Sequence, residues 1–441
     1  MTDRPTATRR LPAVTTLTAT AIVVADMIGV GVFTSLGFQV RDVPSGFALV
    51  LLWVVGGGVA LCGTLCYAEL ATMFPRSGGE YNFLSHMYGP AIGFMAGWLS
   101  ATVGFAAPVA LAAMAFGRYA EAVLPGAPAL PLGLALIWIV TAIHLRGLRH
   151  SSVFQVAFTL LKLALIVVFI GVGFARAGGQ PISFAPSAFD LTQIVSAGFA
   201  VSLVFVMYAY SGWNAATYIV GELRDPQRSL PRALLAGTGC VVVLYVALNA
   251  VFLYTTPLTE LAGQVEVALI AGRHVFGEAG GRLVGLLICA GLIATISAMM
   301  WIGPRVTVAM GEDMAPLRMF ARRTRTGVPT AAILLQGAVA SLLLLTQSFE
   351  AVLAFVQFGL IACSFLTVLG LIRLRITRPD LPRPCRTWGY PFTPLVFLAV
   401  TLFMMVYLVA VRPFQSLAGL LLMLAGLVLY AVATVQRRCG A

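Results

Sequence analysis

Long apolar stretches separated by short polar segments dominate the chain. About twenty apolar residues are enough to carry a helix across the hydrocarbon core of a bilayer. Twelve stretches reach that length, over residues 13–37, 46–73, 91–115, 130–148, 152–173, 190–220, 232–255, 281–309, 329–346, 350–374, 391–411 and 414–436. The pattern therefore predicts an all-α membrane protein with twelve transmembrane helices, in one transmembrane domain over residues 1–441.

Two of these stretches are interrupted by glycine at corresponding places. The first is broken around residues 28–33 and the sixth around residues 210–214, and each opens a block of five spans. The blocks begin on opposite sides of the membrane. Paired broken helices in inverted repeats indicate a transporter site near the midplane, because broken backbone at that depth needs a cavity or a ligand. We predict repeats over 13–173 and 190–374 and two extra helices over 391–436; the alternative is that the glycines only permit close helix packing.

The polar segments between spans predict three further helices. Residues 76–90 follow a glycine turn and favour a short interfacial helix. Residues 256–280 favour a helix over the outer face, and the arginine-rich residues 311–326 favour another on the opposite face.

Composition and charge exclude a soluble globular protein and fix an orientation. The chain is 60% apolar and 10% charged, with mean hydropathy +0.95, far from soluble averages. An inside N-terminus places most of the arginines in cytoplasmic segments, as the positive-inside rule requires. We therefore predict a multi-pass protein of the cell inner (cytoplasmic) membrane with both termini cytoplasmic. The same bias accounts for the net charge of +12 without a nucleic-acid partner.

Two ionisable residues lie deep in the apolar stretches. Lys162, the only lysine of the chain, is central in the run from Val153 to Val172. A charge at mid-membrane depth costs about 2.5–3.5 kcal/mol on insertion scales, so it needs a partner or a wet cavity. Lys162 is either a structural hydrogen-bonding group or a fixed charge in a solute pathway. Asp26, one turn before the first break, has four open roles: counter-ion for Lys162, proton-coupling group, contact to a substrate ammonium, or a protonated group bonded between helices.

Four spaced motifs resemble one family of transporters. They are Gly29–Phe33 (GVGVF), Pro75–Tyr81 (PRSGGEY), Tyr208–Asn214 (YAYSGWN) and Arg386–Pro391 (RTWGYP). The chain resembles the amino acid–polyamine–organocation (APC) superfamily, in particular bacterial permeases of the branch similar to L-type amino acid transporters. The resemblance implies two inverted five-helix repeats with discontinuous first and sixth helices, plus two additional helices.

The resemblance and the breaks together predict a substrate site. N–H groups freed at the first break suit an α-carboxylate, and carbonyls freed near the second suit the ammonium. By position in the motifs, Tyr208 corresponds to the family's aromatic gate, and Val30 stands where relatives often carry serine. The predicted substrate-binding residues are Ile28, Gly29, Val30, Gly31, Met207, Tyr208, Tyr210, Ser211 and Asn214.

Lys162 receives a coupling role from the same resemblance. In sodium-coupled transporters of this fold an ion lies between the first and eighth helices, and a lysine of the fifth helix can replace it. Carbonyls near Gly29 and the hydroxyl of Ser297 are its expected neighbours. We therefore predict transport independent of sodium, by proton symport or substrate exchange, with Lys162, Asp26 and Ser297 as the coupling group.

The predicted function is secondary active transport of neutral L-amino acids by alternating access. The third- and tenth-helix segments 102–108 and 355–363 are small and apolar, which favours neutral side chains. The alternative is an antiporter of amines, polyamines or cationic amino acids, which Asp26 keeps open. The chain lacks the HExxH ligands or paired aspartates of intramembrane proteases, so we predict no enzyme, catalytic residue, metal or cofactor.

The family resemblance also bears on protein partners. Eukaryotic relatives join a heavy subunit through an external cysteine between the third and fourth helices. Residues 119–131 contain no cysteine, so we expect no disulfide-linked heavy subunit and a monomer or homodimer in the bilayer. Glu69, Gln155 and Gln357 lie near helix ends and are interpreted as structural.

Overall fold

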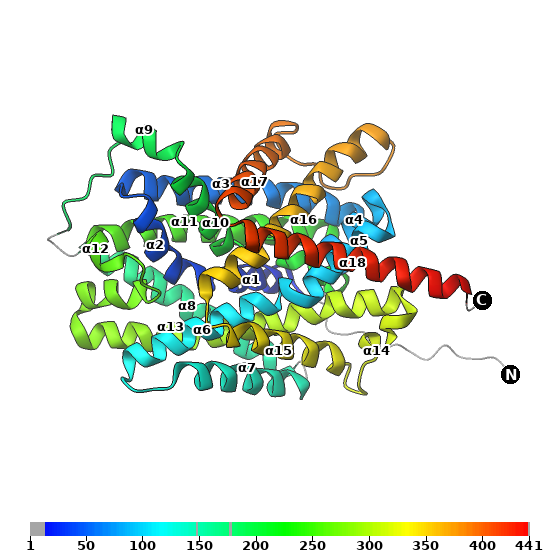
Figure 1. The fold of residues 1–441 in the computed structure, drawn as a ribbon, viewed down its shortest axis with the longest axis horizontal. Coiled ribbons are helices and arrows are strands. Elements are labelled where there is room, and N and C mark those ends of the chain that lie inside the picture. The colour runs from blue at the N-terminus through cyan, green and yellow to red at the C-terminus, as the bar shows by residue number, and fades with distance from the viewer. Residues whose placement is uncertain (1–13, 147–148, 176–178, 440–441) are drawn as a thin grey trace.

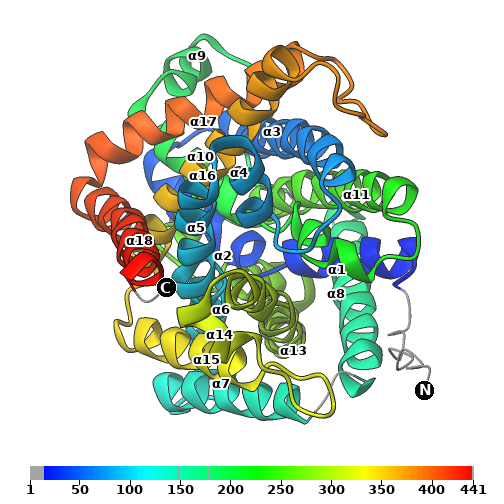
Figure 2. The ribbon, with the colours of Figure 1, turned by 90° about the vertical axis from the view of Figure 1, so that its right-hand side faces the viewer.

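The fold is a bundle of long helices. The computed structural model describes residues 14–146, 149–175 and 179–439. Within these ranges the chain is all-helical, and its one β-bridge pairs Val14 with Leu223. Figure 1 shows most of the long helices aligned with the long axis of the molecule, and Figure 2 shows the bundle end-on. The predicted all-α class is confirmed.

The helices coincide with the apolar stretches. Eight segments are long and apolar enough to cross a membrane: α1–α2 (Thr16–Met27 and Gly31–Asp42), α3 (Gly46–Met73), α5–α6 (Pro90–Leu99 and Ala106–Val123), α11 (Pro226–Thr255), α13 (Val267–Asp313), α16 (Phe349–Thr377), α17 (Phe392–Val411) and α18 (Pro413–Cys439). Shorter apolar helices fill three more predicted spans: α7 (Ala129–Leu145), α8 (Arg149–Ala175) and α15 (Thr330–Leu345).

The predicted sixth span, residues 190–220, is not one continuous helix in the structure. A separate helix α9 (Ala188–Ile194) is bent by 67° from α10 (Ala197–Ala209). Each of the two helices has its own N-cap, since Ser187 forms a capping box with Asp190 and Ser196 accepts a bond from the backbone of Phe199. Two separately capped helices cannot continue one another. The apolar residues before Ala197 therefore belong to a flanking helix.

The three polar segments are helical where the sequence predicts it. The interfacial helix is α4 (Glu80–Tyr88). The second segment contains α12 (Leu258–Leu261) and the first turns of α13, which Gly277 then breaks with a φ of 76°. The third contains the 3₁₀ turn Ala315–Leu317 and α14 (Arg318–Ala321).

The broken first span lies at the centre of the bundle. In its most apolar window 83% of residues are buried within the protein, compared with 17% for α18. Figure 1 accordingly shows α1 near the middle of the bundle, whereas Figure 2 shows α17 and α18 at the edge. Because the interior of the bundle has no lipid contact, a polar site can be built there. The repeat boundaries 13–173 and 190–374 stay a prediction.

Candidate functional site

The first helix break is formed as the glycine pattern predicts. Helix α1 ends at Met27 and α2 begins at Gly31. Between them the backbone N–H of Gly29 donates to the carbonyl of Met27 at 2.7 Å. This bond joins residues two apart, whereas an α-helix joins residues four apart. The carbonyl of Ile28 is left outside both helices. The first N–H groups of α2 likewise have no partner within their own helix.

The second break follows α10 directly. After Ala209 the chain turns through Tyr210–Asn214 and continues as a 3₁₀ helix, Ala215–Glu222. Gly212 at the turn has φ 97°, a left-handed conformation that other residues adopt only with strain. The turn therefore depends on glycine at this position.

The two breaks are in direct contact. A Cβ on Gly212 would lie 2.7 Å from Oδ2 of Asp26, and a Cβ on Gly31 would lie 2.5 Å from Cα of Ala209. Both distances are too short for any side chain. Glycine thus lets segments almost two hundred residues apart meet at one point.

Lys162 bridges the first break to the surrounding helices. Its Nζ donates to the carbonyl of Ile28 at 2.7 Å and to Oγ1 of Thr295 at 2.6 Å. The side chain is 3% exposed and extends from α8 past Gly291 of α13. A buried ammonium is stabilised by such hydrogen bonds to carbonyl and hydroxyl acceptors. The expected contact to the first break is therefore present.

The eighth-helix partner of Lys162 is Thr295, not Ser297. Oγ of Ser297 lies 3.0 Å from Nε2 of the buried His144 on α7. Residues two apart on an α-helix point in directions about 200° apart, so Thr295 and Ser297 cannot face the same neighbour. The sequence identified the correct helix turn and the wrong side of it.

Asp26 does not form a salt bridge with Lys162. Asp26 is 4% exposed, and its Oδ1 is buried without a hydrogen-bond partner in the described part of the chain. The ammonium of Lys162 is already occupied by Ile28 and Thr295. The role of direct counter-ion is thus not realised, and the other roles of Asp26 stay open.

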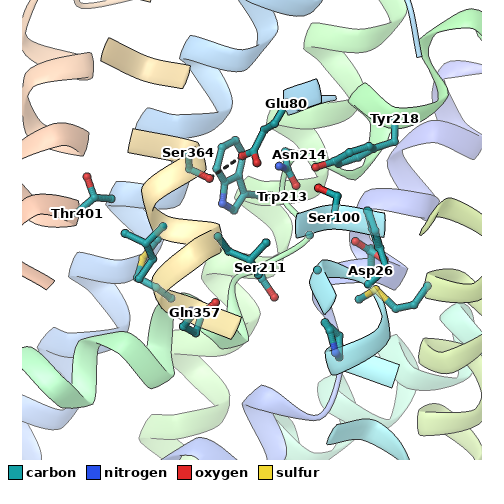
Figure 3. Close-up of a pocket in the computed structure, with 18 of the residues that line it drawn as sticks. Asp26, Glu80, Ser100, Ser211, Trp213, Asn214, Tyr218, Gln357, Ser364 and Thr401 are labelled. Atoms are coloured by element: carbon teal, nitrogen blue, oxygen red, sulfur yellow. Dashed lines mark hydrogen bonds between the residues drawn. The ribbon is translucent and has the colours of Figure 1, made fainter. Parts of the chain in front are cut away.

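A cavity lies beside the contact between the two breaks. It is lined from the last turn of α1, the second break, the third span and α16, with a volume of about 100 Å³. Figure 3 shows Asp26 and Ser100 on one side and Gln357 and Ser364 on another, with Asn214 and Trp213 between them. For comparison, a cavity of about 150 Å³ can bind benzene. The cavity is therefore somewhat smaller than one that holds benzene.

The predicted binding residues divide into two groups. Met207, Ser211 and Asn214 line the cavity, together with Asp26 of the predicted coupling group, whereas Ile28, Gly29, Val30, Gly31, Tyr208 and Tyr210 are not among its lining residues. Tyr210 is fully buried, with its hydroxyl donating to the carbonyl of Trp53 at 3.0 Å. The carbonyl of Tyr208 already accepts two bonds from Ser211. Tyr210 is thus a packing residue here.

Tyr208 belongs to an aromatic cluster next to the cavity. Its ring packs edge-on against Phe349 at 6.5 Å, and Phe38 stacks on both Phe349 and Phe205. These rings come from α2, α10 and the start of α16. The cluster thus connects α2, α10 and α16, and the gate role of Tyr208 stays a prediction.

Sequence reasoning missed Glu80 and Ser100 in the cavity wall, whereas Gly104 lies in the segment 102–108 that it connected with the substrate. Glu80 of α4 is 3% exposed and lines the cavity, with Oε1 accepting bonds from the hydroxyls of Tyr67 and Ser364. Ser100 and Gly104 line it from a π-helical turn between α5 and α6. Such turns are frequent at functional sites. The carboxylate of Glu80 was visible within the second motif, but the π turn has no sequence signal of its own.

Gln357 also lines the cavity, although the sequence analysis interpreted it as a structural residue. Its Nε2 donates to the carbonyl of Val204 at 3.4 Å. Glu69, in contrast, is confirmed as structural. It is fully buried and pairs with Arg375 and Arg383, and it also accepts bonds from Thr387.

Comparisons with known proteins agree with this geometry. The family model described as "Amino acid permease" matches residues 14–433. The chain belongs to the amino acid permease family. It is 28% identical to the b(0,+)-type amino acid transporter 1 of Mus musculus over 94% of this chain and 86% of that protein.

Two further relatives match over similar lengths. The Asc-type amino acid transporter 1 of Mus musculus is 28% identical, over 96% of this chain and 81% of that protein. The large neutral amino acids transporter small subunit 2 of Oryctolagus cuniculus is 27% identical, over 94% and 79%. This permease is therefore a multi-pass membrane transporter and not an enzyme.

Proposed function

We propose that this permease moves amino acids across the membrane by alternating access around the cavity. The observation that carries the proposal is the contact of two broken helices beside that cavity, through Gly212 and Asp26 and through Gly31 and Ala209. Broken helices in contact leave polar backbone groups beside a cavity at mid-membrane depth. The relatives are named as amino acid transporters, which supports the same substrate class.

We propose neutral L-amino acids as the main substrates. Gly104, Pro108, Leu360 and Ile361 give the cavity small or apolar walls, and its volume of about 100 Å³ suits a small side chain. The substrate carboxylate would approach the free N–H groups at the start of α2. Its ammonium would approach the second break, where Met207 and Ser211 line the cavity and Asp26 is adjacent.

Transport would be independent of sodium. The ammonium of Lys162 already occupies the space between the first break and α13, bonded to Ile28 and Thr295. A second cation there would meet a fixed positive charge. Coupling by proton symport or by substrate exchange both fit this arrangement, since neither requires a bound metal ion.

An antiporter of amines, polyamines or cationic amino acids is the second candidate. Two carboxyl groups, Asp26 and Glu80, line the cavity, and no lysine or arginine does so among the described residues. This charge distribution would accept a cationic substrate. Agmatine and putrescine are the test compounds, because they lack the carboxylate that the first candidate requires.

Location and partners complete the proposal. We propose that this multi-pass permease lies in the cell inner membrane with both termini cytoplasmic, because most of its arginines then lie in cytoplasmic segments. Because residues 119–131 lack cysteine, we propose that it works without a disulfide-linked heavy subunit, as a monomer or homodimer.

The decisive experiment is a thermal-shift screen of the purified protein over amino acids and amines. Uptake into liposomes follows, with and without sodium and a proton gradient. Stabilisation by neutral amino acids and sodium-independent uptake are expected. Stabilisation by agmatine or putrescine but by no amino acid would replace the first candidate with the second.

A further inference from the structure

Glu80 is a buried carboxyl group without a basic partner. It begins α4, and the packing of α4 against α16 brings its side chain to the cavity, where Figure 3 shows it beside Ser364. Both of its hydrogen bonds, from Tyr67 and Ser364, go to Oε1. In the described part of the chain Oε2 accepts no bond, and no arginine or lysine forms an ion pair with Glu80.

The contrast with Glu69 shows what is missing. Glu69 is equally buried, but Arg375 and Arg383 neutralise its charge. A buried carboxylate with only hydroxyl partners keeps an uncompensated charge, which is costly in a low-dielectric interior. Glu80 therefore needs a positive occupant, which is either a proton or a cationic group that enters the cavity.

A second carboxyl group points to a ligand of the same charge. Asp26 lines this cavity, is more than nine-tenths buried, and has a buried Oδ1 without a partner among the described residues. Apart from these two carboxyls, the cavity lining of the described chain is uncharged. Oδ1 of Asp26 and Oε2 of Glu80 can each accept a hydrogen bond from an N–H group of a ligand.

We infer that Glu80 is the subsite for the cationic end of a basic amino acid, and that this group replaces a proton held there when the substrate is neutral. The inference rests on the proposed transport function and extends its substrate range. Both loaded forms carry the same net charge, since a neutral substrate with protonated Glu80 equals a basic substrate with ionised Glu80. One transporter can then move both classes without a change in the charge of its core.

The surroundings of Glu80 agree with proton exchange at this position. Burial raises the pKa of Glu80, and the hydrogen bonds from Tyr67 and Ser364 oppose that shift. The titratable groups that face it are Tyr67 of α3, Tyr218 of the 3₁₀ helix and Cys363 of α16. Lys162 faces Asp26 instead. No neighbouring group of the described chain supplies a positive charge to Glu80 itself.

The pH dependence follows in sign. Because the folded-state pKa of Glu80 is raised, protons compete with a basic side chain at acidic pH and release the site as pH rises. Binding of lysine should therefore strengthen with pH through the titration of Glu80, by up to about tenfold per pH unit for one proton displaced. Binding of alanine displaces no proton, so it should lack this rise.

The test is equilibrium binding of L-lysine, L-arginine and L-alanine to the purified full-length permease across pH, compared with Glu80→Gln. Loss of a hydrogen bond to a charged group costs about 10- to 100-fold in affinity, so the ratio of lysine to alanine affinity should fall by that factor. The pH rise for lysine should disappear. Glu80→Asp, which keeps the charge on a shorter side chain, should restore part of both.

Controls separate the possible outcomes. Glu121→Gln makes the same chemical change at a surface carboxyl with 48% side-chain exposure, and should alter neither ratio nor pH profile. Size-exclusion chromatography checks that each variant is folded. Binding of alanine without binding of lysine or arginine, or an equal loss of both classes in Glu80→Gln, would overturn this inference alone. Binding of no amino acid would refute the proposed function and the inference with it.

Discussion

Replacing Lys162 by methionine is the sharpest test of the site. The change keeps an unbranched side chain of similar length and removes only the ammonium. It leaves the carbonyl of Ile28 with the hydroxyl of Thr295, at 3.3 Å, as its remaining partner. The tether between α8 and the break in the first helix is then lost.

Two opposing terms set the size of the effect. Each hydrogen bond from an ammonium contributes about 1.5–3 kcal/mol, and only the bond to Ile28 reaches the break, so Lys162 restrains the break by about 1.5–3 kcal/mol. Burying the ammonium costs several kcal/mol, which methionine does not incur. Global stability should therefore change little, whereas the broken helix keeps only the longer bond from Thr295 to Ile28.

Transport should fall much more than stability. If the restraint of about 1.5–3 kcal/mol is needed to hold the transport-competent break, activity should decrease by about 10- to 100-fold. The assay is uptake of labelled substrate by proteoliposomes across pH, with thermal unfolding measured on the same preparations. Thr295→Val, which removes one of the two acceptors, should have a smaller effect in the same direction.

The control and the refuting result are specific. Leu160→Met on the lipid-facing side of the same helix is 60% exposed and should transport normally. If Lys162→Met transports like the wild type at every pH, Lys162 contributes only packing. A variant that yields no folded protein would instead show that the ammonium stabilises the whole bundle. The lost hydrogen bonds would then outweigh the avoided cost of burying the charge, contrary to the expectation.

Other consequences can be checked by single substitutions. Gly212→Ala should lower the unfolding temperature by several degrees, because alanine at a φ of 97° is strained by about 1–3 kcal/mol and its Cβ would have no space. Gly58→Ala is the matched control in the same thermal assay, because no atom lies near the position of its Cβ. Glu69→Gln should destabilise the fold by about 3–5 kcal/mol by leaving two buried arginines unpaired, and unchanged denaturant unfolding would disprove this. Tyr208→Ala should weaken the closure against Phe349 and accelerate substrate dissociation in stopped-flow measurements.

The membrane helices and the two breaks were predictable because their causes are local. A run of apolar residues specifies a span through its length, and glycine specifies a break through its backbone freedom. Residues 46–73 match α3 at both ends for this reason. The need of Lys162 for a buried partner was also local, since the cost of a charge in hydrocarbon depends on its depth alone.

Other features depend on how helices rotate and pack. The choice of Thr295 over Ser297 depends on the rotation of α13 about its axis, which the apolar pattern of a helix buried on many sides does not specify. The exclusion of Tyr210 from the cavity likewise depends on its packing against Trp53 of α3.

The chain by itself determined a multi-pass helical membrane protein, two glycine breaks and a buried lysine that requires partners. Only the tertiary structure decided which groups meet at the breaks, and it brought Glu80 from an interfacial helix into the same cavity as Asp26. Apolar length and backbone freedom act within one segment and can be read along the chain. The residues that line the cavity come from several helices, so they depend on which faces of those helices meet in the folded protein.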